Sequence, residues 1–544
     1  MLLQRGSLQD REEAMSGRVW FQMLGLVAWL CLLSLGPVQG GKVLVMPADG
    51  SHWLSLKILV KGLVHKGHDV VVLVPESSLF MHQSEDYKTE VYPVSFTMEE
   101  MDATFKQLKD GLFLKQPDWT EYYVNIMRFV NFTSIHLRGC ENLLQNQHLM
   151  SRLKGMGFDI VLTDPFFPCG ALVGHIFSIP VVNFLRGLPC GLDLKVNKCP
   201  SPPSYIPVPY SGYTDIMTFP QRVINMAMTV VESYQCSLLY GHYDEIVSKY
   251  LGSNMDYRTL LSHGALWLIR NEFTLDWPRP LLPNMVLIGG INCAEKKKNA
   301  SLPADLEEFV QGSGDDGFII FTLGSMLPDM PQEKAQHFLD AFRQIPQRVV
   351  WRYAGDPPKG LPKNVKLMKW LPQKDLLAHP KARLFLTHGG SHSVYEGICN
   401  AVPMLMFPLF AEQGDNGLRM VTRGAAETLA IYDVTSDKLL AALNKILKNK
   451  SYKEKITELS QIHHDRPVAP LDLAVFWTEF VIRHKGAAHL RVAAHELNWI
   501  QYHSLDVFGF ILLILLTVLW TTLKCCLFCT RRCCRGGTAK AKSE

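Results

Sequence analysis

The sequence lacks a concentration of charge of either sign. It has 55 lysines and arginines against 51 aspartates and glutamates, a net charge of +4, and only 19% charged residues. Proteins that bind nucleic acid usually carry a basic face or stripe. The small excess here is spread along the chain, so we expect no nucleic-acid partner. A chain of 544 residues with 47% hydrophobic content is long enough for two domains with full cores plus membrane segments.

The sequence also lacks the usual signatures of a bound metal. No cluster of acidic residues suggests a divalent cation, and the seven cysteines in the central part of the chain form no Cys-x-x-Cys zinc pair. Because seven is odd, at least one of these cysteines should be a free thiol. The pair Cys526-Leu-Phe-Cys529 in the tail lies beside a predicted membrane span, where acylation or no role is favoured over metal. We therefore predict no metal.

Two apolar runs stand near the ends of the chain. The first, Phe21–Leu35, follows Arg18 and precedes small residues, so residues 1–40 are interpreted as a secretory signal peptide, with Met15 as the working start. The second lies within residues 505–523. Its uncharged part, 507–523, is long enough for one transmembrane helix at ~1.5 Å per residue. A buried core helix is the alternative for this second run.

The tail after the predicted span, residues 524–544, is basic, and it ends in Lys540-Ala-Lys542-Ser-Glu. Positive residues favour the cytosolic side of a membrane, so the domains between signal and span should be lumenal. The ending resembles a Lys-x-Lys-x-x signal for retrieval to the endoplasmic reticulum. Three Asn-x-Ser/Thr triplets, at Asn131, Asn299 and Asn449, are glycosylation candidates consistent with a lumenal position.

A βαβ unit is predicted at the start of the mature chain. An apolar strand at Lys42–Met46 is followed by an apolar helical face from Leu56 to Val64, a stop at Gly67 and a second strand. His52 stands where the first helix begins, at the carboxyl end of the first strand. The positive end of a helix favours a neutral imidazole that can accept a proton. The alternative is a capping or packing histidine.

A second strand, Phe158–Thr163, delivers a carboxylate in the same way. Asp164 follows it directly and precedes Pro165. On the residues alone, a turn-forming Asp-Pro pair is the preferred interpretation.

The segment from Trp370 to Asn416 carries the main functional pattern. Arg383–Thr387 is interpreted as a buried strand, and His388-Gly-Gly-Ser391 as the turn that opens a helix. Paired glycines let a diphosphate approach the backbone N–H groups at a helix start. In this arrangement His388 can donate to a phosphate oxygen and Glu396, about one turn further, can accept from ribose hydroxyls.

Other side chains of this segment suit the rest of a nucleotide sugar. Trp370 offers a flat face for a base, and Gln373 an amide for its edge. Glu412 and Gln413, after the next predicted strand, could bind sugar hydroxyls. Each of these residues alone is equally compatible with a turn or core role, and it is their order and spacing that favour a site.

These motifs resemble the signature of the UDP-glycosyltransferases. The match includes Trp370-Leu-Pro-Gln373, Thr387-His-Gly-Gly390, Val394-Tyr-Glu-Gly-Ile398 and Pro408-Leu-Phe-Ala-Glu-Gln-Gly-Asp-Asn416, and it extends from about Gly41 to the C-terminus. The animal, membrane-bound branch, the microsomal UDP-glucuronosyltransferases, is the most similar. The family usually has Asp where this chain has Glu412. Position 392 is His, as in one branch, where another has Asn.

The resemblance implies an α/β fold of GT-B type. Two Rossmann-like domains face each other across a cleft, with one C-terminal transmembrane helix. The predicted acceptor-binding domain covers residues 41–295 and the UDP-sugar-binding domain residues 296–480. Residues 481–504 then form a helical segment that returns to the first domain, part of a helical stretch read from Val475 to Trp499.

The resemblance also assigns roles to single residues. It implies that His52 is the catalytic base and that Asp164 orients it. Ser325, His388, Gly390 and the helix start would face the phosphates, and Arg270 and His392 would also face the donor. For Ser325 a simple tight turn is the equal alternative, and for Arg270 a surface ion pair is the more common role.

The expected activity is transfer of glucuronic acid from UDP-glucuronate to small lipophilic phenols, steroids, xenobiotics or acids. It would proceed with inversion, with a UDP-sugar co-substrate and no cofactor. Homo- or hetero-oligomers with related enzymes are compatible with this interpretation. One alternative is a related enzyme that uses UDP-glucose, UDP-galactose or UDP-N-acetylglucosamine. Another is a catalytically silent protein that binds lipophiles or a partner enzyme.

Overall fold

The computed structural model describes residues 40–109, 111–113, 119–293, 302–327 and 329–535. The predicted signal peptide up to residue 39, the sequon at Asn299 and the retrieval signal at the C-terminus lie outside the described residues. Of the other two sequons, Asn131 is exposed on a helix and Asn449 is exposed between two helices.

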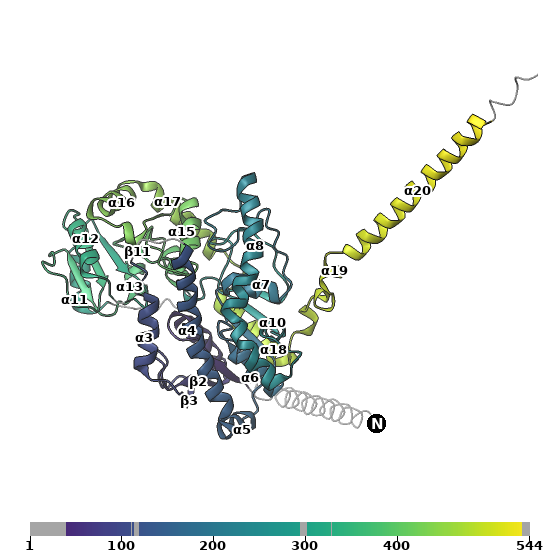
Figure 1. Ribbon diagram of the computed structural model, residues 1–544. Helices are drawn as coiled ribbons and strands as arrows, with labels where there is room; N and C mark the ends of the chain where they lie inside the picture. The colour runs from purple at the N-terminus through teal and green to yellow at the C-terminus, as the bar shows by residue number, and fades with distance from the viewer. Residues whose placement is uncertain (1–39, 110, 114–118, 294–301, 328, 536–544) are drawn as a thin grey trace, which may run out of the picture.

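Two parallel sheets organise the chain (Figure 1). The first has the order β3-β2-β1-β4-β5-β6-β7 and the second the order β10-β9-β8-β11-β12-β13. The strands of the first sheet are β1 (Lys42–Met46), β2 (Asp69–Pro75), β3 (Lys88–Tyr92), β4 (Ile160–Thr163), β5 (Val181–Leu185), β6 (Leu266–Ile269) and β7 (Met285–Leu287). Those of the second are β8 (Phe318–Thr322), β9 (Arg348–Arg352), β10 (Val365–Met368), β11 (Ala382–Thr387), β12 (Met404–Met406) and β13 (Ala426–Thr428).

Helices connect the strands and cover both faces of each sheet. Around the first sheet these are α2 (Ser51–His65), α3 (Met98–Lys109), α4 (Trp119–Gln145), α5 (Gln147–Gly155), α6 (Cys169–Phe177), α7 (Leu192–Val196), α8 (Phe219–Tyr240), α9 (Asp244–Leu251) and α10 (Tyr257–Ser262). Around the second they are α11 (Ala304–Gln311), α12 (Gln332–Phe342), α13 (Gln373–Ala378), α14 (Ser391–Cys399), α15 (Gln413–Thr422), α16 (Ser436–Lys448) and α17 (Lys450–His464).

The central strands are apolar runs because they are buried on both faces. All five residues of β5 and all five of β8 are buried, as sheets covered by helices on both sides require. Each sheet is flanked by two apolar cores, one per face. The predicted α/β fold with two Rossmann-like halves is thus confirmed.

The order of the strands places a switch point in each sheet. In the first, β1 lies between β2 and β4, so the chain runs outward from β1 in one direction and returns to its other side with β4. In the second, β8 lies between β9 and β11 in the same way. In open α/β sheets, ligands bind beyond the carboxyl ends of the strands at such points.

The chain returns to the first sheet through α18 (Pro470–His484). Ala474, Val475 and Val481 of this helix are buried in the same core as β1 and β2, and α18 packs on α2. The prediction of helix from Val475 to Trp499 is wrong beyond His484. Lys485 and Gly486 both have positive φ, 54° and 130°, which ends the helix. Short 3-10 turns at Ala488–Leu490 and Ala493–Glu496 and the four-residue helix α19 (Trp499–Tyr502) follow.

The last described helix, α20 (Leu505–Arg535), extends away from the body (Figure 1). Among the described residues it is the one helix long and apolar enough to cross a membrane, with a mean hydropathy of 2.3 and none of its apolar window buried. This agrees with the predicted span at 505–523 and with membrane anchoring.

Three disulfides join six of the seven central cysteines. The pairs are Cys140–Cys169, Cys190–Cys236 and Cys293–Cys399. Cys199 is left as a buried free thiol, which confirms the expectation from the odd number.

Candidate active site

A cleft of about 970 Å³ opens beyond the carboxyl ends of the two sheets, with lining residues from both. All twelve predicted catalytic and donor-binding residues line it. The first sheet contributes His52, Asp164 and Arg270. The second contributes Ser325, Trp370, Gln373, His388, Gly390, His392, Glu396, Glu412 and Gln413. Residues that are spread over more than 350 positions of the chain thus meet in one cavity, because each follows a strand at the same edge of its sheet.

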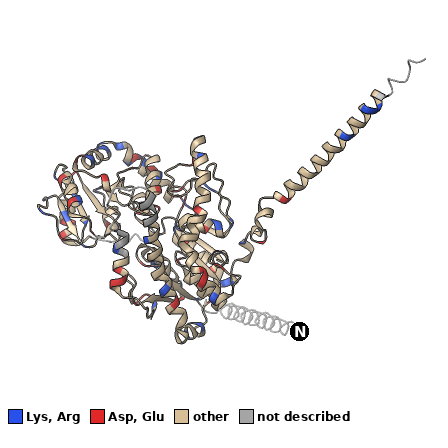
Figure 2. Cartoon of the chain, in the orientation of Figure 1, with Lys and Arg blue, Asp and Glu red and all other residues tan. Residues whose placement is uncertain are grey.

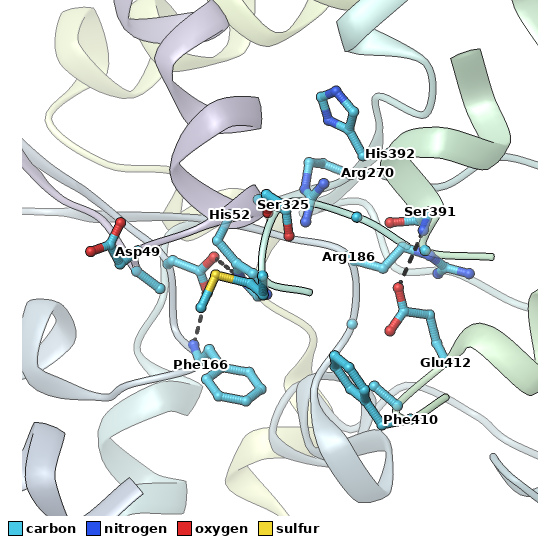
Figure 3. Close-up of a pocket in the computed structure, with 18 of the residues that line it drawn as sticks. Asp49, His52, Phe166, Arg186, Arg270, Ser325, Ser391, His392, Phe410 and Glu412 are labelled. Carbon is cyan, nitrogen blue, oxygen red and sulfur yellow. Dashed lines mark hydrogen bonds and ion pairs between the residues drawn. The ribbon is translucent and has the colours of Figure 1, made fainter. Parts of the chain in front are cut away.

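His52 and Asp164 form a hydrogen-bonded pair at the switch point of the first sheet. His52 lies in the first turn of α2 after β1, and Asp164 follows β4. Nδ1 of His52 lies 2.6 Å from Oδ2 of Asp164. The other carboxylate oxygen of Asp164 accepts from the backbone N–H of Phe166 at 3.0 Å. Asp164 is 3% exposed, whereas about a third of the His52 side chain is open to the cleft (Figure 3).

Ser55, one turn after His52 on α2, joins the two halves of the cleft. Its Oγ lies 2.9 Å from Nδ1 of His392 on α14 and accepts from Nη1 of Arg270 at 2.9 Å. Burial lowers the pKa of Arg270, while the charges of Asp164 and Glu412 raise it. The guanidinium of Arg270 therefore lies between the His52 pair and the second sheet, as Figure 3 shows.

The start of α14 lies at the switch point of the second sheet, directly after β11. Gly389 has φ 86°, a conformation that favours glycine. A Cβ on Gly390 would fall 2.5 Å from Nε2 of His388, so no larger residue fits while that ring keeps its place. Burial lowers the pKa of His388 to about 4, although Glu412 opposes the shift. His388 is therefore neutral at neutral pH and keeps one N–H to donate.

Glu412 faces the same helix start. Its Oε1 accepts from the backbone N–H of Ser391 at 3.4 Å (Figure 3). Burial raises the pKa of Glu412, but the charge of Arg186 and hydrogen bonds to the backbone together lower it by more. The pKa of Glu412 therefore lies below its usual value. Gln413 is turned inward: its Oε1 accepts from the backbone N–H groups of Leu409 and Phe410 and shapes that loop.

Trp370, Gln373 and Glu396 line another part of the cleft. Trp370 is 53% exposed, and the guanidinium of Arg352 lies 4.8 Å from the centre of its ring. Gln373 donates from Nε2 to a carboxylate oxygen of buried Glu396. The other carboxylate oxygen of Glu396 lies 3.4 Å from Nε2 of His392.

Ser325 lies in the loop after β8. Its Oγ is buried and lacks a hydrogen-bond partner among the described residues. Nη2 of Arg352 donates to the backbone oxygen of Ser325 at 3.1 Å and holds the loop in place.

An aromatic wall lines the cleft on the side of the first sheet. It consists of Phe129, Phe132, His136, Phe166 and Phe167. The ring of His136 stacks on Phe167 with centroids 3.9 Å apart and planes 7° from parallel, and Phe166 packs edge-on against His52. These contacts give the cleft an apolar region directly beside the histidine pair.

Replacing His136 by phenylalanine should remove an acid sensitivity of the fold. Burial lowers the pKa of His136 from 6.5 to about 4. As the pH falls below 6.5, His136 is protonated in the unfolded chain but stays neutral in the folded chain. The free energy of unfolding therefore declines between pH 6.5 and 4, by at most about 3 kcal/mol. We expect the unfolding temperature of the wild type to fall more than that of His136→Phe between pH 7 and 4.5. Equal shifts would contradict this.

Among the residues that the structure describes, potential metal ligands come together at one place away from the cleft. Atoms of Cys293, Cys399 and His463 lie close enough to share an ion, but the two sulfurs are joined in a disulfide. The disulfide removes both thiolates, so this group does not form a metal site.

Comparison with known proteins identifies the family. The model of the family "UDP-glucoronosyl and UDP-glucosyl transferase" matches residues 41–540. The chain belongs to this family. It is therefore a glycosyltransferase, and the resemblance seen in the sequence is confirmed.

Individual relatives agree over nearly the whole chain. A UDP-glucuronosyltransferase of Pleuronectes platessa is 95% identical over 472 residues, which are 87% of this chain and all of the relative. UDP-glucuronosyltransferase 1A1 is 48% identical in Rattus norvegicus, over 95% of this chain and 96% of the relative. In Homo sapiens it is 46% identical, over 93% and 95%.

Solved structures share the fold. The calicheamicin glycosyltransferase CalG4 covers 82% of this chain and 100% of its own, with a TM-score of 0.53 and 17% identity. The spinosyn forosaminyltransferase SpnP covers 81% and 99%, with a TM-score of 0.55 and 17% identity. Together with the two parallel sheets, these neighbours confirm the predicted GT-B type.

Several cleft residues of this glycosyltransferase were missed by sequence reasoning. Arg186 follows β5 at the same edge of the sheet as Asp164, so the strand-end rule that found Asp164 would have found it too. Phe166 and Phe167 follow Asp164-Pro165 and could have been assigned to the same loop. Arg352 is the last residue of β9, so the same rule would have found it. Ser55 carries no signal of this kind, because its contact with His392 depends on how the two sheets face each other.

Proposed function

We propose that this chain transfers glucuronic acid from UDP-glucuronate to a hydroxyl or carboxyl group of small lipophilic acceptors, with inversion at the anomeric carbon. The observation that carries the proposal is the His52–Asp164 pair, which faces the start of α14 across one cleft. Phenols, steroids and xenobiotics are the acceptor classes that an aromatic wall beside the base would suit.

His52 acts as the general base. Its Nδ1 is engaged with Asp164, which leaves Nε2 to take the proton of the acceptor. Asp164 holds the ring in this tautomer and stabilises the imidazolium that forms. The deprotonated oxygen attacks the anomeric carbon, and UDP leaves on the opposite side.

The second sheet binds the donor. The negative charge of the leaving UDP is met, without a metal, by the N–H groups at the start of α14, the N–H of His388 and the buried hydroxyl of Ser325. Gly390 lets the diphosphate approach the backbone. Arg270, between the two halves of the cleft, faces the donor with its positive charge.

The remaining donor contacts fall to five side chains. Trp370 stacks on the base, on the opposite face of its ring from Arg352, and Gln373 contacts the edge of the base. Glu396 accepts from the ribose hydroxyls. Glu412 and His392 contact the sugar, while Gln413 acts mainly through the loop that it holds.

The enzyme works at a membrane of the endoplasmic reticulum. We place residues 41–504 in the lumen, residues 505–523 of α20 in the bilayer and the basic tail from residue 524 in the cytosol, as a single-pass type I protein. The first domain covers residues 41–295 and the second 296–480. The sequons at Asn131, Asn299 and Asn449 remain candidates for glycosylation, and oligomers with related enzymes fit this arrangement.

One observation keeps other donor sugars as candidates beside UDP-glucuronate. Glu412 departs from the usual Asp at the sugar end of the site, which keeps UDP-glucose, UDP-galactose and UDP-N-acetylglucosamine as candidates. Turnover of a phenol and steroid panel by microsomes that express the chain, with each of the four UDP-sugars, decides between them. Conjugation with UDP-glucuronate alone would support the proposal, and selective use of another sugar would replace the donor.

The Glu412→Asp variant tests the role of this side chain. Shortening it by one methylene withdraws the carboxylate from the N–H of Ser391, a contact already 3.4 Å long, and from Arg186. We expect the KM for the donor to rise about tenfold, the equivalent of ~1.4 kcal/mol, with a smaller change in kcat. Glu412→Gln keeps the length and removes the charge. An unchanged KM in both variants would remove Glu412 from the sugar site.

A further inference from the structure

The outer face of α8 is apolar and open to solvent. It is formed by Phe219, Val223, Met226, Val230, Val231 and Tyr234, and Val230 is 73% and Phe219 70% exposed. Ile216, just before the helix, is 86% exposed. These residues recur at helical spacing and form one continuous stripe, which a helix at an ordinary protein surface does not carry.

Charge is nearly absent from this face. Arg222 is the one charged residue exposed along the described helix, because Glu232 is buried and pairs with Nζ of Lys195 at 2.7 Å. Figure 2 accordingly shows little charge colour on α8, as on the apolar part of α20. The opposite face of α8 packs against the protein, with Cys236 in a disulfide and Leu239 at the cleft.

The membrane anchor leaves the body beside α8. Nη1 of Arg491 donates to the backbone oxygen of Ser262 on α10, and Nη2 of Arg258 on α10 donates to Oγ of Ser237 on α8 at 2.7 Å. A linker of residues 492–504 separates this attachment at Arg491 from α20. Fully extended it would span at most about 45 Å, which limits how far the C-terminal end of α8, at Ser237, can lie from the start of α20.

The linker of residues 492–504 has side chains that suit a membrane surface. Trp499 is 69% exposed on α19, and its neighbours Leu497 and Ile500 are exposed as well. Tryptophan collects at the headgroup level of bilayers. Figure 1 shows the upper end of α8 standing clear of the neighbouring helices, while α20 runs to the upper right of the view.

We propose that the outer face of α8 docks on the lumenal leaflet of the bilayer that holds α20. The apolar stripe enters the headgroup and acyl boundary, and the cleft, whose wall includes Gln235 and Leu239 of the same helix, opens next to the lipid. The chain is thus attached to the membrane at two places. This docking does not depend on which sugar the enzyme transfers.

Lipid labelling of the whole chain tests the docking. The full-length protein is reconstituted in phosphatidylcholine vesicles that contain a phosphatidylcholine with a photoactivatable acyl chain, and adducts are located by mass spectrometry. We expect adducts on residues 219–234 as well as on α20, and none on exposed peptides of α16. Adducts confined to α20 would overturn the proposal, as would cross-linking of α8 to a second copy without lipid adducts.

Charged variants make the test specific. Val223→Glu combined with Val230→Glu places two carboxylates on the stripe, and both positions are exposed, so the fold should persist. Adducts on α8 should fall to background while those on α20 stay unchanged. Leu361→Glu, on an exposed loop of the second sheet, is the matched control and should leave labelling of α8 intact. Retained labelling in the double variant, with an unfolding temperature equal to that of the wild type, would contradict docking through this face.

Discussion

The His52→Ala variant is expected to lose between two and four orders of magnitude in kcat, the usual contribution of a positioned general base. The ring is held by a 2.6 Å contact to Asp164 and faces the acceptor side of the cleft. Its hydrogen bond and its ring contact are with Asp164 and Phe166, both of the first half, and the link to His392 is made by Ser55. Binding of UDP to the variant should therefore stay within about twofold of the wild type. Initial rates with UDP-glucuronate and a phenol, together with UDP binding, measure both.

Two further variants separate catalysis from folding. His65→Ala removes an exposed histidine at the other end of the same helix and should leave kcat unchanged. Asp164→Asn keeps the shape of the buried partner but removes its charge, so it should lower kcat by roughly two to four orders of magnitude. Turnover that persists in His52→Ala would contradict the assignment of His52 as the general base. Loss of UDP binding in that variant would point to structural damage instead.

The fold was predictable because its strands are short apolar runs with clear ends. The strands predicted at Lys42–Met46, Phe158–Thr163 and Arg383–Thr387 correspond to β1, β4 and β11, whose ends differ from the prediction by at most two residues. The prediction failed after His484. There the residues remain apolar enough for a helix, but the left-handed backbone at Lys485 and Gly486 interrupts it. Such a break depends on local backbone geometry, which a hydrophobic pattern does not record.

The residues of the candidate site also divide into those that could be predicted from the sequence and those that could not. Residues that directly follow strands, such as Asp164 and His388, could be placed from sequence because parallel strands end at one edge of a sheet. The link between Ser55 and His392 could not be predicted, because the two residues are separated by 337 positions. Arg270 was expected to face the donor, and its observed contact with Ser55 joins two residues of the first half that lie 215 positions apart in the chain. Contacts of this kind follow from tertiary packing alone.

The Glu396→Ala variant is expected to raise the KM for the UDP-sugar about 30-fold, the equivalent of ~2 kcal/mol for a charged hydrogen-bonding group. Glu396 is 6% exposed and is contacted by Gln373 and His392. Its carboxylate is thus fixed before the donor arrives, and removal costs binding rather than the chemical step. The effect should appear in the donor KM, with kcat changed by less than about threefold.

The pattern of losses across variants then tests the division of labour in the cleft. Glu396→Gln keeps the side-chain shape and should lose less than Glu396→Ala, because an amide can still bond to a hydroxyl. Glu458→Ala, on exposed α17, should have no effect on either constant. If Glu396→Ala lowered kcat and left the donor KM unchanged, Glu396 would act in the chemical step. The assignment of catalysis to the first sheet and donor binding to the second would then be wrong, because α14 belongs to the second sheet yet would carry part of the reaction.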